Sequence, residues 1–306
     1  MASLPDAPLL LSGGVGGPAV ILLCTPLRNA LTLGSQDPRS GVRLLYRKAF
    51  RGGLKAGWTG GLAPALVASP QFLALSPVYH MLDGGLREAL GGAGGQALPS
   101  LLAAVGAGLA ETLLTFGSQS RNAQMAYNKS FVQFSSIVDG SRRTLRLNKV
   151  YRVWGPGASA MALRNMASIA GLRVLSPWLR ERVPLGAHGS GTRAALCDVA
   201  SSLVICPLSA PVHQLFNFLV TTPEAAHMPL RERARLALDF LNRQYFVPLP
   251  RETMLLRLGE EVPPQRYGWR PTATALRDLG MRSLYVTSVF TLFMSIERSL
   301  CAAMRR

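Results

Sequence analysis

The chain repeats one sequence pattern three times, and a repeat of this length constrains the architecture before any single motif is considered. Three segments each close a long apolar stretch: TPLRNALTLGSQ (25–36), GSQSRNAQMAYN (117–128) and CPLSAPVHQLFN (206–217). After each comes a basic segment, and then a cluster of aromatic and glycine residues that opens a second apolar stretch, at 57–70, 153–168 and 267–280. We therefore predict a single domain of three repeats, covering about 1–95, 96–188 and 189–306.

The apolar stretches are long enough to cross a membrane. Hydrophobic residues make up 48% of the chain and charged residues only 16%, against about 25% charged in soluble domains. A membrane helix needs about 20 apolar residues, and we place the spans at 8–27, 60–82, 98–117, 157–179, 194–220 and 271–296. A soluble all-helical domain with buried helices is the alternative. Six weakly charged spans that recur in order favour an all-α membrane protein with six transmembrane helices.

Several of these spans are rich in Gly, Ala and Ser rather than Leu. Examples are GGVGGPAV (13–20), AAVGAGLA (103–110) and AALCDVASS (194–202). Small residues on a helix face let neighbouring backbones approach closely. We therefore expect these segments to be helix-packing surfaces. The glycine-rich first segment could suggest a phosphate-binding loop, but no Lys-Ser/Thr pair follows it.

The net charge of +17 is unevenly distributed. Basic residues gather in the three long connections, between spans one and two, three and four, and five and six. The short connections on the other side carry only Arg87, Arg180, Arg182 and Arg193. This asymmetry places the long connections on the negative-potential side of the membrane and both termini on the opposite side.

The long connections also contain two segments in which basic and apolar residues alternate, 40–50 and 229–241. This pattern predicts short amphipathic helices that lie along a membrane surface and meet anionic headgroups. A basic protein could instead bind nucleic acid, but no nucleic-acid motif accompanies these charges. We therefore expect lipids as partners and no nucleic acid.

No residue set in the sequence indicates an enzyme, a metal site or a cofactor. The four cysteines and four histidines lack metal-ligand spacing, and we expect the cysteines to be small buried hydrophobes. No nucleophile is accompanied by a base and an orienting group. The first fourteen residues contain no arginine, so we expect no cleaved presequence and an internal targeting signal.

The threefold pattern resembles the mitochondrial carrier family. That family has three repeats, each an odd-numbered membrane helix, a short matrix-side helix and an even-numbered membrane helix. Its signature is Pro-x-acid-x-x-base at the end of the odd helix, followed by a glycine and aromatic motif before the even helix. Repeat one keeps Gly57-Trp58-Thr59-Gly60 and Pro70, repeat two keeps Trp154 and Gly157, and repeat three keeps Pro207 and Arg270 with a longer connection around 223–265.

The gate signature of that family departs from its pattern in all three repeats. The resemblance implies that the acid and base of the signature form a ring of ion pairs that closes the matrix side. The equivalent positions here are Pro26 and Arg28, Gln119 and Arg121, and Pro207 and Ser209. No repeat supplies the acid, so we expect this ring to be missing, and converging arginines would repel without an anion or acid between them.

The second network that the resemblance implies lies at the opposite face and is also incomplete. Its aromatic-acid-x-x-base signature corresponds to Tyr79–Asp83 in repeat one. Arg180 alone represents it in repeat two, and Phe290 with Phe293 in repeat three. Both gates are therefore expected to be degenerate.

The family's substrate contacts correspond to positions in the even-numbered helices. These positions are Val67, Arg164 with Asn165 beside it, and Arg277 with Asp278 beside it. Two arginines facing one cavity would favour a small anionic solute. The alternative is that they are ion-pair partners of the intramembrane acids Glu111, Asp198 and Asp278. For Glu111 and Asp198 themselves, a role in anchoring neighbouring helices is favoured over proton coupling.

The resemblance implies a transporter that exchanges a small anionic metabolite across the inner mitochondrial membrane by alternating access. Anionic lipids such as cardiolipin would surround it. The missing gate charges leave open a second class: a carrier-fold protein without transport, acting as a scaffold, a subunit of a larger membrane complex, or an outer-membrane insertion or dynamics factor.

Overall fold

The computed structural model describes residues 6–36, 41–51, 53–58, 61–90, 97–134, 145–183, 190–246 and 272–304, and this part of the chain is mostly helical with no strand. Its α-helices are α1 (Ala7–Leu11), α2 (Gly17–Leu23), α3 (Thr25–Gln36), α4 (Val42–Ala49), α5 (Leu62–Leu73), α6 (Tyr79–Leu90), α7 (Ala97–Phe134), α8 (Ala158–Ala170), α9 (Ser176–Arg182), α10 (Ser190–Thr221), α11 (Leu230–Leu241) and α12 (Ala273–Met304).

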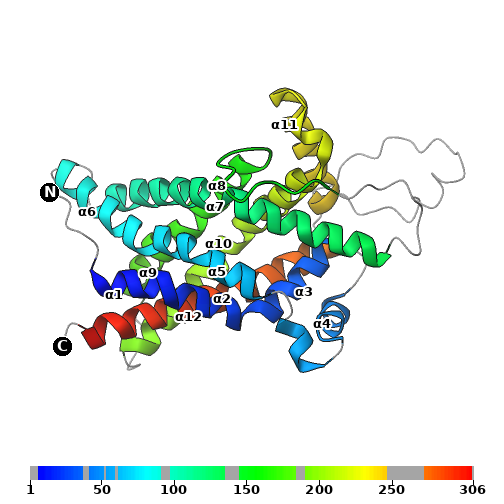
Figure 1. Cartoon of the computed structure of the whole chain (residues 1–306). Coiled ribbons are helices and arrows are strands. Elements are labelled where there is room, and N and C mark those ends of the chain that lie inside the picture. Colours follow the sequence, from blue (N-terminus) through cyan, green and yellow to red (C-terminus); the bar gives the residue numbers. More distant parts are fainter. Residues whose placement is uncertain are drawn as a thin grey trace, which may run out of the picture.

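The long helices form a bundle in which each helical stretch packs against the next one along the chain. Thus α2 contacts α5, α6 contacts α7, α7 contacts α8, and α10 contacts both α9 and α12. Helix α12 then returns to α1, α2 and α3. Helices α1, α6 and α9 and the end of α12 lie at one end of the bundle, which we call the terminal end (Figure 1). Helices α4 and α11 lie at the other end, the long-connection end (Figure 1).

Three helices of the described chain are long and apolar enough to cross a membrane: Ala97–Met125, Gly191–Thr221 and Ala273–Met304. The first expected span becomes a fourth if Ala7–Leu23 and Thr25–Leu31, bent by 60°, are counted as one. The expected spans 60–82 and 157–179 are helical but contain π-helical turns and do not pass as unbroken apolar helices. The structure therefore supports a membrane-embedded helical protein, with fewer spans established than the six expected.

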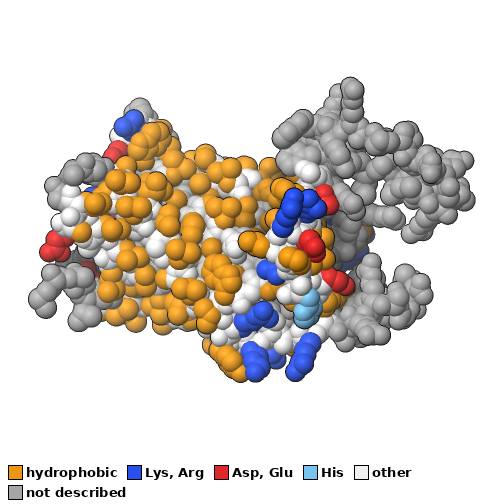
Figure 2. All heavy atoms as spheres, turned by 90° about the horizontal axis from the view of Figure 1, so that it is seen from above, with side chains coloured by type: hydrophobic (Ala, Val, Ile, Leu, Met, Phe, Trp, Pro, Cys, Tyr) orange, Lys and Arg blue, Asp and Glu red, His pale blue; other side chains and the backbone are white. Residues whose placement is uncertain are grey.

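The exposed surface of the bundle is also apolar. One long face is covered by hydrophobic side chains, while charged side chains gather toward the end where α11 lies (Figure 2). Leucines on separate helices are largely exposed, including Leu66 at 67%, Leu114 at 61% and Leu208 at 64%. A soluble monomer rarely exposes a contiguous apolar area of this kind, whereas a lipid-facing bundle does.

Prolines next to π-helical turns interrupt three of the helical stretches. The π-turns are Ser12–Gly16, Ala74–Val78 and Gly171–Leu175, with Pro18, Pro77 and Pro177 in or just after them. Proline has no N–H to continue the helical ladder, so carbonyl groups nearby need other donors. The Ser69 hydroxyl donates to the carbonyl of Gly14 at 2.9 Å. The Tyr79 hydroxyl donates to the carbonyl of Arg173 at 3.4 Å, so neighbouring helices are joined at these π-turns.

Small residues allow the close helix packing that the sequence predicted. A Cβ atom on Gly17 would lie 2.3 Å from the Phe72 ring, and one on Gly108 would lie 2.7 Å from the backbone of Met166. The ring of Phe72 in turn packs on Phe293 of α12, with centroids 4.6 Å apart. These contacts form an apolar core that joins α2, α5, α7, α8 and α12.

The three long connections differ from one another. Two contain the amphipathic helices expected from sequence, α4 and α11. Between α7 and α8 the described chain instead runs back along α7, and we call residues 145–157 the return segment. The Asn128 side chain pairs with both backbone groups of Leu145 at 2.8 Å, and Gln124 accepts from the N–H of Asn148 at 2.7 Å. The polar end of α7 therefore holds this segment in place.

The segment that follows α11 is also held by side chains. The hydroxyl of Thr272 donates to the carbonyl of Gln244 at 2.8 Å. Burial raises the pKa of the neighbouring Tyr245 phenol. A tyrosine phenol is neutral at physiological pH even at its ordinary pKa, so Tyr245 adds no negative charge to the start of α12. Of the extended connection expected at 223–265, residues 247–265 lie outside the described chain.

Substitution of Gly17 tests the close packing of α2. Because its Cβ would meet the Phe72 ring at 2.3 Å, we expect Gly17→Ala to cost about 1–3 kcal/mol through overpacking. Gly14→Ala is the matched control, since nothing lies within 4 Å of its Cβ. Thermal unfolding in detergent micelles, followed by tryptophan fluorescence, measures both. Equal melting temperatures for the two variants would contradict this packing.

Candidate functional site

Arg164 lies inside the bundle, where α8 faces α7. Its side chain is only 5% exposed. It donates from Nε and Nη2 to Oδ1 of Asn165, at 2.9 and 2.7 Å, and from Nη2 to Oε1 of Gln119 at 2.9 Å. Its Nη1 lies 3.1 Å from Nδ1 of His213 on α10. Within the described chain, the buried guanidinium is thus hydrogen-bonded by three neutral acceptors and by no carboxylate.

A second buried guanidinium lies close by, on α12. Arg282 is 8% exposed and lies over the ring of Tyr285, 5.8 Å from its centroid. Its Nε has no hydrogen-bond partner among the described residues. The two guanidinium groups of Arg164 and Arg282 are near enough for their charges to repel. Among the described ion pairs none involves either arginine, so this interior region carries excess positive charge.

The two intramembrane acids have different surroundings. Asp198 accepts from the Ser176 hydroxyl at 2.5 Å and pairs with Arg298 at 2.7 Å, so it joins α9, α10 and α12 as an anchoring residue would. Glu111 is 3% exposed, and its Oε1 has no hydrogen-bond partner among the residues that the structure describes. It interacts with Arg164 only through space.

The other expected contact positions do not reach Arg164. Arg277 forms an ion pair with the adjacent Asp278 at 2.6 Å, and Gln244 donates to the same carboxylate at 3.4 Å. Asp278 therefore orients Arg277 locally, and Arg282, more than one helical turn further along α12, is the arginine near Arg164. Val67 is half-buried on α5 and has no polar side chain to contribute.

The gate-equivalent arginines face different partners. Arg121 donates to the carbonyl of Asn148 in the return segment at 3.3 Å and pairs with no acid in the described chain. Arg28 lies within electrostatic reach of Tyr285 on α12. Gln119, which stands where the family has proline, donates to the Thr115 hydroxyl at 3.2 Å while it accepts from Arg164. This position has thus become part of the interior polar cluster.

The prolines at the gate-equivalent positions act differently in two helices. Pro26 is buried just after Cys24, where the chain bends by 60°. The bend is explained by its missing N–H, which cannot bond the carbonyl of Leu22. Pro207, by contrast, lies within the continuous helix α10. Ser209 is buried and donates to the carbonyl of Cys206 at 3.4 Å, so it is satisfied within its own helix.

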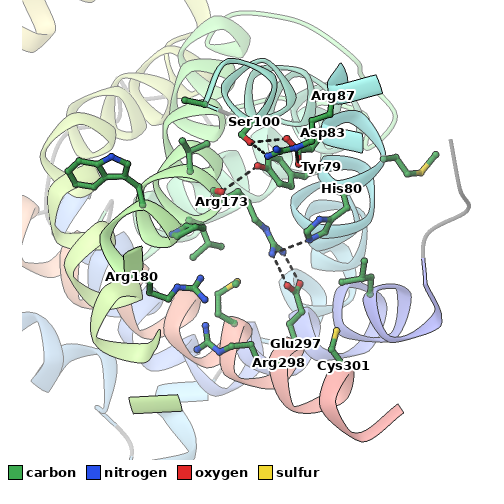
Figure 3. A pocket seen from close by; sticks show the side chains of 18 of the residues that line it. Tyr79, His80, Asp83, Arg87, Ser100, Arg173, Arg180, Glu297, Arg298 and Cys301 are labelled. Carbon is green, nitrogen blue, oxygen red and sulfur yellow. Dashed lines mark hydrogen bonds and ion pairs between the residues drawn. The ribbon is translucent and has the colours of Figure 1, made fainter. Parts of the chain in front are cut away.

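A vestibule of about 670 Å³ opens at the terminal end of the bundle. Figure 3 shows Arg173 reaching across it to Glu297 and His80. The Arg173–Glu297 pair is bidentate, with both N–O distances 2.7 Å, and both side chains are about 6% exposed. Since each charge is fully paired, this ion pair joins α12 to the stretch between α8 and α9 at the base of the vestibule.

Further charges around the vestibule are paired as well. Asp83 accepts from Arg87 and from the Ser100 hydroxyl, each at 2.8 Å (Figure 3). On the far side, Arg180 lies 4.0 Å from Asp198, to which Arg298 also binds. The network expected to be incomplete at this end is therefore replaced by other pairs.

Sequence reasoning missed Arg173, Glu297, Arg298 and Arg282. Each stands several residues from the family's motif positions, so alignment to the motif does not reach it. One signal was available, since a charged residue within an apolar span indicates a buried partner. Among the described residues, no three His, Cys, Asp or Glu side chains gather as a metal site would require.

The arrangement around Arg164 and Arg282 suits electrostatic recognition of a negative group. An interior with two guanidinium groups and amide and imidazole acceptors can bind a negative group through charge-assisted hydrogen bonds.

No family model matches the chain, and a search of curated proteins gives no significant match.

Neutralising one member of the Arg173–Glu297 pair tests its role. We expect Glu297→Gln or Arg173→Gln to cost about 3–5 kcal/mol, because each leaves an uncompensated buried charge. The exposed Arg87, whose side chain is 43% accessible, provides the control, and Arg87→Gln should cost less than about 1 kcal/mol. Unfolding in detergent micelles measures all three. A similar small loss at all positions would show that the buried pair is not a structural link.

Proposed function

We propose that this chain is a carrier-like membrane transporter with six membrane spans in three repeats. The order of helix contacts supports this, because the stretches α1–α3, α5–α6, α7, α8–α9, α10 and α12 follow one another around the bundle. The two amphipathic helices at the long-connection end support the same organisation. Prolines and π-turns account for the three proposed spans that are not continuous helices.

We propose that the protein resides in a mitochondrial membrane, and the resemblance to mitochondrial carriers favours the inner membrane. The basic long connections would face the matrix and both termini the opposite side. In this orientation α4 and α11 lie at the matrix surface, where their basic residues meet anionic lipids. The vestibule at the terminal end then opens away from the matrix.

The main observation in support of a transport function is the environment of Arg164. A buried guanidinium normally has a carboxylate or another acid to compensate its charge. Here Gln119, Asn165 and His213 fix its direction without neutralising it. A second guanidinium, Arg282, adds to the charge and has an unused donor. We propose that a small anion completes this site during transport.

Alternating access would expose the site to one side at a time. Toward the terminal end, the rings of Phe72 and Phe293 pack on each other and Arg173 pairs with Glu297. Toward the long-connection end, Gln124 on α7 donates to the carbonyl of Val220 on α10 at 2.9 Å. For an anion to enter from the terminal end, the contacts at that end would have to separate. For an anion to enter from the long-connection end, the bond between Gln124 and Val220 would have to break.

Uptake into liposomes tests the proposal. Purified protein should exchange at least one of sulfate, malonate, phosphate or lactate against an internal anion. We expect Arg164→Gln to lower the rate at least about tenfold, which corresponds to about 1.4 kcal/mol of lost interaction with the anion. Arg121→Gln is the matched control, because among the described residues Arg121 donates to the return segment alone, and it should keep most of the rate.

Two results would contradict transport. One is the absence of exchange for every anion of the panel in correctly folded wild type. The other is exchange that is equal in wild type and Arg164→Gln, since the anion would then bind elsewhere.

A second function is favoured by one specific feature. The return segment is fixed along α7 where the family has a gate, and Arg121 pairs with no acid within the part of the chain that the structure describes. A protein that no longer opens at this end would act as a membrane scaffold or complex subunit. Migration of the native protein in a large complex, together with failure of every transport assay, would favour this alternative.

A further inference from the structure

Glu111 differs from the other buried acids of the described chain. Asp198 is bound by Ser176 and Arg298, and Glu297 by both Nη atoms of Arg173. Asp278 is bound by its neighbour Arg277. Among these acids, Glu111 is the one with a buried carboxylate oxygen that accepts no hydrogen bond. An ionised carboxylate is poorly compensated in that position.

The location of Glu111 ties it to the anion site. It begins a polar stripe on one face of α7, where Thr112 accepts from Asn165 at 3.2 Å and Gln119 accepts from Arg164 at 2.9 Å. Arg164 therefore lies along the same face. Its N–H groups are used on neutral acceptors, and its interaction with Glu111 is through space.

The other titratable and charged groups on the elements around α7 are not among those that act on Glu111. On α10, His213 lies against Arg164 through Nδ1. On α3, Arg28 reaches Tyr285 of α12. At the terminal end, Arg173 and the α6 residues His80, Asp83 and Arg87 line the vestibule, and Glu88 of α6 is exposed. On α10, Asp198 is bound by Ser176 and Arg298, and Arg193 donates to the carbonyls of Arg180 and Val183. Helix α5 carries no charged residue. Arg164 is thus the charge to which Glu111 responds.

The balance of charge inside the bundle then depends on Glu111. With Glu111 ionised, Arg164 and Arg282 are left with one excess positive charge, which a monoanion neutralises. A dianion would leave the interior with excess negative charge unless Glu111 takes up a proton. Uncompensated charge is strongly unfavourable in an apolar interior.

Building on the transport function proposed above, we propose that Glu111 is the proton-binding residue of the interior site and that a compact dianion is carried together with one proton. The proton adds to a carboxylate oxygen of Glu111 from the water phase on the side where the anion enters. It returns to water on the side where the anion leaves. No covalent bond of the anion changes.

Sulfate is the appropriate probe because it stays fully dianionic across the working pH range, so any proton taken up belongs to the protein. Proteoliposomes with the membrane potential clamped by potassium and valinomycin would be given a gradient of one pH unit, acidic outside. We expect sulfate accumulation in wild type to rise about tenfold, as one coupled proton per anion requires. A pH dye inside the vesicles should report acidification that accompanies sulfate.

The substitution Glu111→Gln removes the proton site but mimics its protonated form. We expect this variant to take up sulfate with no response to the pH gradient and no internal acidification. The exposed Asp239 on α11 provides the control, and Asp239→Asn should behave as wild type. Gel filtration and thermal unfolding establish that each variant is folded. If Glu111→Gln is unstable, Glu111→Asp is the second variant: it keeps the carboxyl group and should therefore still move protons together with sulfate.

The outcomes separate this inference from the transport function. Uptake of sulfate without protons, a pH response retained in Glu111→Gln, or uptake of lactate but not of sulfate or malonate would overturn proton coupling at Glu111 while transport stands. Absence of uptake for every anion would overturn transport itself, and with it this inference.

Discussion

A guanidinium group buried in an apolar helix bundle is unfavourable unless hydrogen bonds and counter-charges replace the water that it loses. The structure meets this requirement in two ways. Arg173 is neutralised by a bidentate pair with Glu297 and so joins two parts of the bundle. Arg164 is fixed by Asn165, Gln119 and His213 without being neutralised. The first arrangement suits a structural link, and the second suits a site that a negative solute completes.

Much of the fold could be predicted from sequence. The apolar stretches gave the positions of the long helices, and the small residues around Gly17 and Gly108 gave their packing faces. Alternating charge gave α4 and α11. The return segment could not be predicted, because its position depends on hydrogen bonds from distant side chains such as Gln124. The bend before Pro26 and the π-turns also depend on how neighbouring helices satisfy freed backbone groups.

The candidate site was predicted less completely. Arg164 and Asn165 lie in the buried polar cluster, but Arg277 is held by its own neighbour Asp278 and Arg282 takes the interior position. A motif alignment fixes a position along a helix, whereas the partner of a charged group is decided by which helices face one another. The same limit explains why Asp198 and Glu111, at similar places in their helices, have different surroundings.

The central claim is that Arg164 occupies a water-accessible transport site rather than a sealed core. The most direct measurement is chemical labelling of Arg164→Cys, in a background without the four native cysteines, by a membrane-impermeant thiol reagent in proteoliposomes. If Arg164 occupies such a site, the cysteine is labelled from at least one side of the membrane. Inertness of this cysteine from both sides of the membrane, in protein that is folded and correctly inserted, would contradict it.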